Sequence, residues 1–95
     1  MGQMSSRKRD SLEVIYDILK IIMGHNNSIK PTPLLRFSNL SSSSFLEYYN
    51  ELIAKEFVKE VPDKHGRKYI TLTDRGFQYL EKYRFIQGFI SEFEL

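Results

Sequence analysis

A change of hydrophobic periodicity after Lys55 constrains the fold of this chain more than any other feature. Before it, apolar residues recur at the three- and four-residue spacing of a helix, whereas residues 57–61 and 69–72 are rich in β-branched and aromatic side chains. Between these two segments, Asp63 and Gly66 occupy the first and last positions of a type I turn. The pattern predicts a two-stranded β-hairpin.

The chain ahead of the hairpin begins with an amphipathic helix over about residues 10–23. Gly24 is predicted to end it in the left-handed conformation, and a polar loop follows. Pro31 biases Lys30 toward extended backbone, which allows a very short edge strand at Ile29. The apolar face of the helix consists of Leu12, Ile15, Ile18, Leu19 and Ile22.

A short second helix is predicted from Pro33 to about Phe37. Thr32 is expected to be its N-cap, because Pro33 then takes the first helical position, where a missing N–H costs nothing. Residues 38–40 form a tight turn after it. This turn leads directly into a run of four serines.

The serine run is interpreted as the start of a third helix that ends near Lys55. Ser41 caps a helix that begins at Ser42, or else Ser44 and Glu47 form a capping box that begins it later. A flexible linker is the alternative, but the amphipathic pattern that follows directly favours capping.

Thr73 is predicted to cap a last helix that runs from Asp74 almost to Leu95. The order is therefore helix, helix, helix, hairpin, helix, which is the order of a winged helix-turn-helix. We predict an α+β, mostly helical fold with an extended C-terminal helix. The predicted parts are a basic, flexible N-terminal arm (1–9), a winged helix-turn-helix domain (10–80) and a C-terminal helix (74–95) that serves as a dimerisation element.

Composition bounds the classes of protein to which the chain can belong. Its 95 residues suffice for one domain, and no apolar run approaches the roughly 20 residues that span a bilayer. There is no cysteine, so disulfides and thiolate chemistry are excluded, and no secretory signal precedes the first helix. These features predict a cytoplasmic protein without a membrane partner.

Residues 39–58, followed by residues 69–76 with the Leu72-Thr73-Asp74-Arg75-Gly76 entry into the last helix, resemble the archaeal winged-helix transcription-regulator family. This family includes small dimeric chromatin-type DNA-binding proteins. The resemblance covers about residues 10–80, and it implies that the helix at 42–55 faces the major groove while the hairpin tip touches the backbone or minor groove. It also implies dimerisation through the last helix.

One departure from the family pattern concerns the end of the helix at 42–55. Many relatives carry a glycine just after it, where this chain has Glu56. A residue with a Cβ at this position either adopts a costly positive φ or avoids it.

The net charge of +2 is too small to identify a partner, but its distribution is informative. Positive charge gathers in the arm and at residues 63–68 of the hairpin, which we call the wing. Side chains there can reach DNA phosphates, whereas Asn50 can read an adenine edge. Solvated, non-functional charge is the alternative at each place. The predicted DNA-binding residues are Arg7, Lys8, Arg9, Arg36, Ser42, Ser43, Asn50, Lys64, His65, Arg67 and Lys68.

The predicted recognition helix has few positive charges. Its core side is assigned to Phe45, Tyr49, Leu52 and Ile53, which leaves Leu46, Glu47 and Glu51 on the open side with Asn50. The two carboxylates there would repel the DNA backbone unless one accepts a hydrogen bond from a cytosine amino group. The wing is thus expected to act as a clamp more than as a reader of sequence.

The last helix carries an apolar stripe at coiled-coil spacing, which would be a large exposed patch in a monomer. We predict a homodimer through this stripe, against the alternative that the helix folds back on the first helix. Gly88 weakens the helix locally and permits close helix approach. The predicted dimerisation residues are Tyr79, Tyr83, Ile86, Phe89, Ile90 and Phe93.

Catalysis has little support in the sequence. His25 and His65 stand forty residues apart, without cysteine or metal-ligand spacing, and no glycine-rich phosphate loop occurs. We therefore expect no enzyme, cofactor, metal or small-molecule ligand. The leading hypothesis is a dimeric regulator or chromatin-associated protein that binds double-stranded DNA, and the alternative is a protein-interaction module that does not bind DNA directly.

Overall fold

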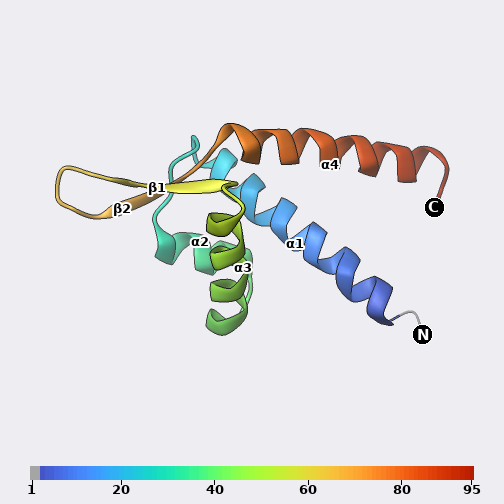
Figure 1. Ribbon diagram of the computed structural model, residues 1–95, viewed down its shortest axis with the longest axis horizontal. Coiled ribbons are helices and arrows are strands. Elements are labelled where there is room, and N and C mark those ends of the chain that lie inside the picture. The colour runs from blue at the N-terminus through green and yellow to red at the C-terminus, as the bar shows by residue number, and fades with distance from the viewer. Residues whose placement is uncertain (1–2) are drawn as a thin grey trace.

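The computed structural model describes the backbone of residues 3–95 and the side chains from Ser11 onward. It contains the predicted order of three helices, a hairpin and a last helix (Figure 1). The elements are α1 (Gln3–Gly24), α2 (Pro31–Ser38), α3 (Ser42–Ala54), β1 (Val58–Pro62), β2 (Lys68–Leu72) and α4 (Asp74–Glu92).

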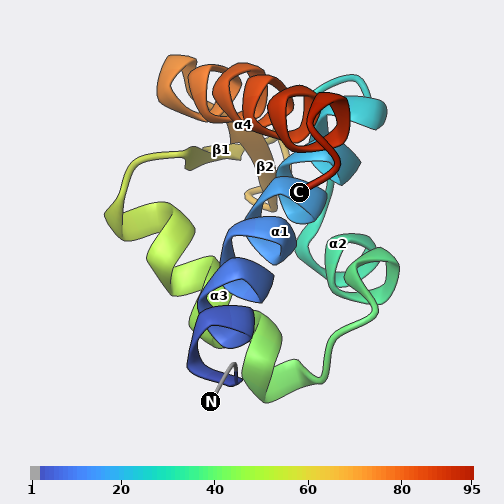
Figure 2. The same ribbon diagram turned by 90° about the vertical axis from the view of Figure 1, so that its right-hand side faces the viewer.

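Helix α1 is the centre of the domain. It lies between α4 on one side and α2 and α3 on the other, and the hairpin extends outward from their junction (Figures 1 and 2). Every element contributes to one core, which buries α1 on several faces. Two residues predicted for the core, Leu12 and Ile53, are exposed. The buried hydrophobic residues are Ile15, Tyr16, Ile18, Leu19, Ile22, Ile29, Leu34, Phe45, Leu52, Val58, Ile70, Leu72 and Leu80.

The ends of α1 differ from the prediction. The helix begins at Gln3, well before residue 10, so the backbone that was expected to be a flexible arm is helical from Gln3 onward. The side chains of the three basic residues at 7–9 lie outside the described residues. At the other end Gly24 remains helical, and Asn26 and Asn27 adopt the left-handed conformation, with φ of 60° and 57°. Asparagine tolerates this region better than other residues with a Cβ.

The start of α2 was predicted two residues too late. Its N-cap is Lys30, which makes no side-chain capping bond, and Pro31 rather than Pro33 takes the first helical position. Thr32 is therefore inside the helix. A proline fits any position of the first turn, because N–H groups there have no partner within the helix, so the two prolines did not fix the start.

The start of α3 follows the first of the two alternatives. Ser41 is extended, and its Oγ accepts a hydrogen bond from the Ser44 N–H at 3.2 Å. The other alternative, in which Ser44 and Glu47 form a capping box, is therefore wrong. The serine run is thus one N-cap followed by the first turn of the helix.

The hairpin pairs antiparallel, with Val58 opposite Leu72 and Pro62 opposite Lys68. The predicted short strand at Ile29 is confirmed as a bridge to Ile70. This bridge fastens the base of the hairpin to the loop that follows α1. The outer half of the hairpin, which ends in the wing, extends beyond the core (Figure 1).

The junction between α3 and α4 is held by backbone bonds. The N–H groups of Glu56 and Phe57 donate to the carbonyls of Ile53 and Leu52 at 3.0 and 2.9 Å, which is the bonding pattern of a Schellman motif. Glu56 adopts the positive φ, at 61°. Thr73 caps α4 as predicted, and its Oγ1 also donates to the Glu56 carbonyl.

Helix α4 has a packed half and a projecting half. Tyr79 and Tyr83 contact α1: the Tyr79 hydroxyl donates to the Leu12 carbonyl at 2.7 Å, and the Tyr83 ring lies 4.6 Å from that of Tyr16. Beyond Tyr83 the helix extends away from the domain (Figure 1). Folding back on α1 therefore occurs only over the first half.

Candidate nucleic-acid interface

The wing presents its basic side chains to solvent. Asp63 shapes the turn: its Oδ1 accepts the N–H groups of His65 and Arg67, each at 2.8 Å, and its carbonyl accepts from Gly66 at 3.2 Å. Gly66 has a φ of 79°, which its lack of a Cβ permits. One oxygen of the Asp63 carboxylate thus accepts two bonds from the backbone of the turn. Within the described part of the chain, Lys64 and Arg67 form no ion pair.

Lys68 differs from the other wing residues because it has a partner. Its Nζ lies 3.4 Å from Oε1 of Glu60, and Glu60 also accepts a hydrogen bond from the Tyr49 hydroxyl. The Tyr49 hydroxyl and, to a smaller extent, Lys68 lower the pKa of Glu60, whereas burial and Glu60 raise the pKa of Tyr49. This link joins α3 to the inner face of the hairpin.

The two long sides of α3 have different chemistry. Tyr49 marks the side that faces the wing, because its hydroxyl reaches Glu60 on β1. Leu46 lies one turn before Tyr49, Ile53 lies one turn after it, and Asn50 is next to it in the chain. All three side chains are exposed. The side that faces the wing is therefore uncharged at these positions.

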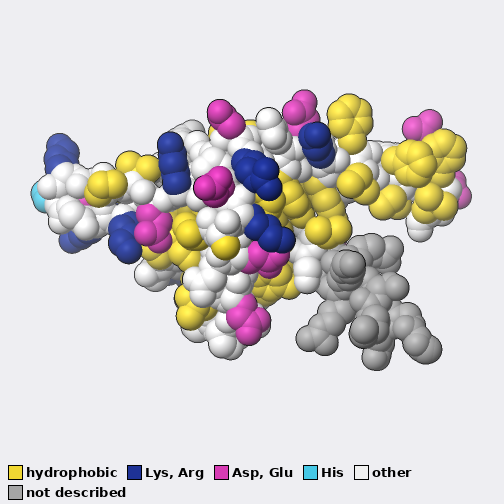
Figure 3. Space-filling model, in the orientation of Figure 1, with side chains coloured by type: hydrophobic (Ala, Val, Ile, Leu, Met, Phe, Trp, Pro, Cys, Tyr) yellow, Lys and Arg dark blue, Asp and Glu magenta, His cyan; other side chains and the backbone are white. Residues whose placement is uncertain are grey.

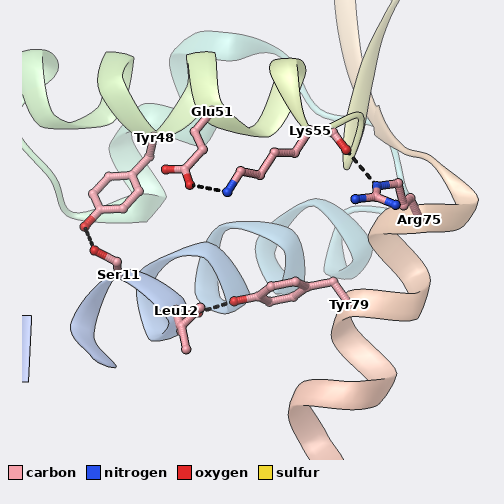
Figure 4. Close-up of polar contacts among 7 residues, drawn as sticks. All are labelled: Ser11, Leu12, Tyr48, Glu51, Lys55, Arg75 and Tyr79. Atoms are coloured by element: carbon pink, nitrogen blue, oxygen red, sulfur yellow. Dashed lines mark hydrogen bonds and ion pairs between the residues drawn. The ribbon is translucent and has the colours of Figure 1, made fainter. Parts of the chain in front are cut away.

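The opposite side of α3 faces α1 (Figure 4). There the Tyr48 hydroxyl lies 3.4 Å from Oγ of Ser11, and Glu51 forms an ion pair with Lys55 at 3.1 Å. Glu51 was predicted to lie on the open side with Asn50, and this is wrong. Glu47 is one helical turn before Glu51 and is exposed. Glu51 thus lies away from the wing, whereas Glu47, which is also one turn before Asn50, lies between the two sides.

The remaining predicted DNA contacts are exposed but are not all brought together. Ser42 and Ser43 form the exposed first turn of α3, whereas Arg36 is exposed near the end of α2. Figure 3 shows the basic side chains of the wing at one end of the molecule, with a histidine among them, and few basic side chains over the lower end of α3. The DNA-binding roles of all these residues stay predictions.

Sequence reasoning missed Glu60 and the contact of Arg75 with the end of α3. The hairpin register gives a signal for Glu60, because it sets Glu60 opposite Ile70 and hence diagonal to Lys68 on the same face. The Arg75 Nε donates to the Lys55 carbonyl at 2.9 Å, at the end of α3 (Figure 4). The Arg75 guanidinium lies over the Phe57 ring.

Comparison with known proteins agrees with this architecture. The family model of winged helix-turn-helix proteins matches residues 8–91. The chain belongs to the winged helix-turn-helix family. Proteins of this family are typically DNA-binding and not enzymes. No solved structure matches the chain significantly.

One relative of this chain occurs in an archaeon. The chain is 32% identical over 79 residues to an uncharacterized protein of Methanocaldococcus jannaschii, and the match covers 83% of this chain. The chain spans about a third of the length of that relative, because the match covers 34% of it. The similarity thus extends over one part of a longer protein.

The described residues contain neither a candidate membrane span nor a candidate metal site. No described helix is long and apolar enough to cross a membrane. Among the same residues, no cluster of three or more histidine, cysteine or acidic side chains has metal-site geometry.

Proposed function

We propose that this winged helix-turn-helix protein binds duplex DNA, with the wing as an electrostatic clamp and α3 in the major groove. The observation that carries the proposal is the state of Lys64 and Arg67. Both side chains are exposed on the turn, neither forms an ion pair among the described residues, and the nearby Asp63 accepts two backbone N–H groups at its Oδ1. Their charges are therefore available to phosphates.

The first turn of α3 supplies a second contact to the DNA backbone in this proposal. Ser41 caps only the Ser44 N–H, so the N–H groups of Ser42 and Ser43 point outward at the positive end of the helix dipole. Both hydroxyls are exposed and can donate to a phosphate as well. This contact sets the position of α3 on the duplex but does not read its sequence.

Salt titration of DNA binding tests the clamp. Each phosphate contact contributes about −0.9 to the slope of log K against log salt concentration. Over a tenfold change in salt concentration, one contact therefore changes the affinity about eightfold. We expect the Lys64→Ala, Arg67→Ala double variant to reduce the slope by about 1.8 for each bound subunit. Lys82→Ala, which removes an exposed charge on α4, is the matched control and should change the slope little.

Two results would refute DNA binding through the wing. One is the absence of binding to labelled duplex at low salt. The other is a slope that the double variant leaves unchanged. In either case a pull-down that gives a stoichiometric protein partner and no DNA would support the alternative, a protein-interaction module.

We also propose that the protein acts as a homodimer through the projecting half of α4. Phe85, Phe89 and Phe93 are 76, 57 and 59% exposed, and Ile86 and Ile90 are exposed beside them. With about 200 Å² for each aromatic side chain, this surface buries about 1,000 Å² in a pair, which is the lower bound of specific interfaces. Tyr79 and Tyr83 contribute less, because they already contact α1.

Charge favours an antiparallel arrangement of the two α4 helices. Arg84 and Glu92 each lie four residues from Gly88, and all three line one shallow groove. No atom lies within 4 Å of the position that a Cβ on Gly88 would occupy, so a second helix can approach there. In an antiparallel pair that crosses at Gly88, Arg84 faces Glu92 of the partner subunit, whereas a parallel pair would bring like charges together.

Light scattering and charge exchange test the dimer. Arg84→Glu should weaken dimerisation by placing two carboxylates together, and the Arg84→Glu, Glu92→Arg double variant should restore it, because each exposed pair contributes about 0.2–1 kcal/mol. Truncation after Tyr83 should yield a monomer. A truncated chain with the dimer mass would refute dimerisation through α4.

A further inference from the structure

The side of α3 that faces the wing carries an exposed apolar pair. Leu46 is 57% exposed and Ile53 is 37% exposed, and they stand two turns apart with Asn50 between them. We call Leu46, Asn50 and Ile53 the reading stripe. Tyr49, next to the stripe, contacts Glu60 of the hairpin, so the stripe lies on the same side of α3 as the hairpin.

The reading stripe has no charged side chain of its own. Of the two carboxylates of α3, Glu51 pairs with Lys55 toward α1, whereas exposed Glu47 lies one turn before both Asn50 and Glu51, at the edge of the stripe. In Figure 3 the lower end of α3 shows acidic surface on the side away from the wing and uncharged surface toward it. A polyanion that binds the wing therefore meets the uncharged stripe on the near side of α3, with Glu47 beyond it.

An apolar side chain in the major groove can distinguish one base from the others. Thymine alone presents a methyl group there, whereas cytosine presents an amino donor and the purines present polar edges. Asparagine can form a bidentate pair with adenine. We infer that the reading stripe recognises A·T pairs, with Leu46 and Ile53 against thymine methyl groups and Asn50 on an adenine.

This inference rests on the proposed DNA binding and assigns sequence preference to α3. The wing supplies affinity through phosphates that all sequences share, so it cannot select a site. The stripe supplies the difference between sites. Burial of one thymine methyl by an apolar side chain corresponds to about fourfold in affinity, from about 0.8 kcal/mol for each buried methyl-sized group.

Replacement of thymine by uracil tests the inference directly, because uracil lacks the methyl group and keeps the same hydrogen-bonding edge. The preferred duplex is first selected from a random pool with the full chain. Its affinity is then compared with that of the same duplex in which uracil replaces thymine. We expect the wild-type chain to bind the uracil duplex about fourfold more weakly for each methyl that it contacts.

Two variants distinguish reading from clamping. Leu46→Ala should lower the ratio of thymine to uracil affinity by about fourfold, and it should fold normally because Leu46 is exposed. Lys64→Ala should weaken binding to both duplexes and leave their ratio unchanged. Ile53→Ala, with its smaller exposed surface, should lower the ratio less than Leu46→Ala.

The inference is overturned if wild-type chain binds both duplexes equally, or if the selected site has no thymine. In those cases wing-dependent binding would persist, so the proposed DNA binding would stand. It is also overturned if Leu46→Ala leaves the ratio unchanged. A chain that binds no duplex at low salt refutes both the inference and the proposed function.

Discussion

Replacement of Glu56 by glycine is expected to stabilise the protein. Glu56 follows the last turn of α3 in the Schellman motif, with φ at 61°, and its side chain is exposed. Its backbone makes the contacts that matter: the N–H donates to Ile53, and the carbonyl accepts from Thr73 Oγ1. Glycine keeps these contacts and removes the Cβ that opposes the left-handed conformation.

The magnitude follows from two opposing contributions. A residue with a Cβ pays about 1–2 kcal/mol in the left-handed region. Glycine loses about 0.5–1 kcal/mol more backbone entropy on folding than a residue with a Cβ. The net effect of Glu56→Gly is therefore a gain of about 0.5–1 kcal/mol in the free energy of unfolding, or about 2–8 °C in Tm for a chain of this length.

Thermal and urea denaturation followed by circular dichroism measure this change. Ala54→Gly is the matched control, because Ala54 lies in the last turn of α3 and glycine there should cost about 0.5–1 kcal/mol. Glu56→Ala separates backbone from charge, since it removes the carboxylate and keeps the Cβ. The reasoning is refuted if Glu56→Gly lowers the stability, or if Glu56→Ala stabilises the protein equally.

Three further changes test the contacts that hold the domain together. Gly76→Ala should destabilise by at least about 1–3 kcal/mol in a urea titration, because its Cβ would lie 2.2 Å from the Phe57 carbonyl oxygen; an unchanged midpoint would contradict this close packing. Tyr79→Phe should cost about 1 kcal/mol by removing the donor to Leu12. Burial raises the pKa of Tyr79 to about 12, so in wild-type chain its contribution should be present below pH 10 and lost as pH rises toward 12, a loss that the variant should lack. The pKa of Glu60 is lowered from 4.5, chiefly by the hydrogen bond from Tyr49, so its contribution to stability is present above pH 4.5 and lost as pH falls through the lower folded-state pKa. Glu60→Gln should therefore flatten the fall in the free energy of unfolding at acid pH. An equally steep fall in the variant would exclude a stabilising link between Glu60 and Tyr49.

The order of the elements could be predicted because each one has a local signal. Helical spacing, the Ser41 and Thr73 caps, and the turn formed by Asp63 and Gly66 depend on residues a few positions apart. The start of α2 could not be settled, because two prolines fit its first turn equally well. The departure from the family's glycine at position 56 left open whether Glu56 adopts a positive φ or avoids it, and the structure shows that Glu56 adopts it.

The functional surface depended on contacts that sequence spacing does not show. The exposed charges of Lys64 and Arg67 were evident from the turn itself. The side of α3 that faces the wing was not, because the sequence gives the helical period but not the rotation of the helix about its axis. That rotation is fixed by long-range contacts of Tyr49 with Glu60 and of Tyr48 with Ser11. They turn Glu51 toward α1 and leave Leu46 and Asn50 exposed on the other side.

The sequence by itself determined the fold class, the wing and the amphipathic α4, since these follow from local spacing and capping. Tertiary structure decided which half of α4 is free, because only the packing of Tyr79 and Tyr83 on α1 uses up the first half of the predicted stripe. It also decided that Glu51 faces α1 and not the open side of α3. Both outcomes depend on how separate helices meet, and packing between distant segments has no signature in local sequence.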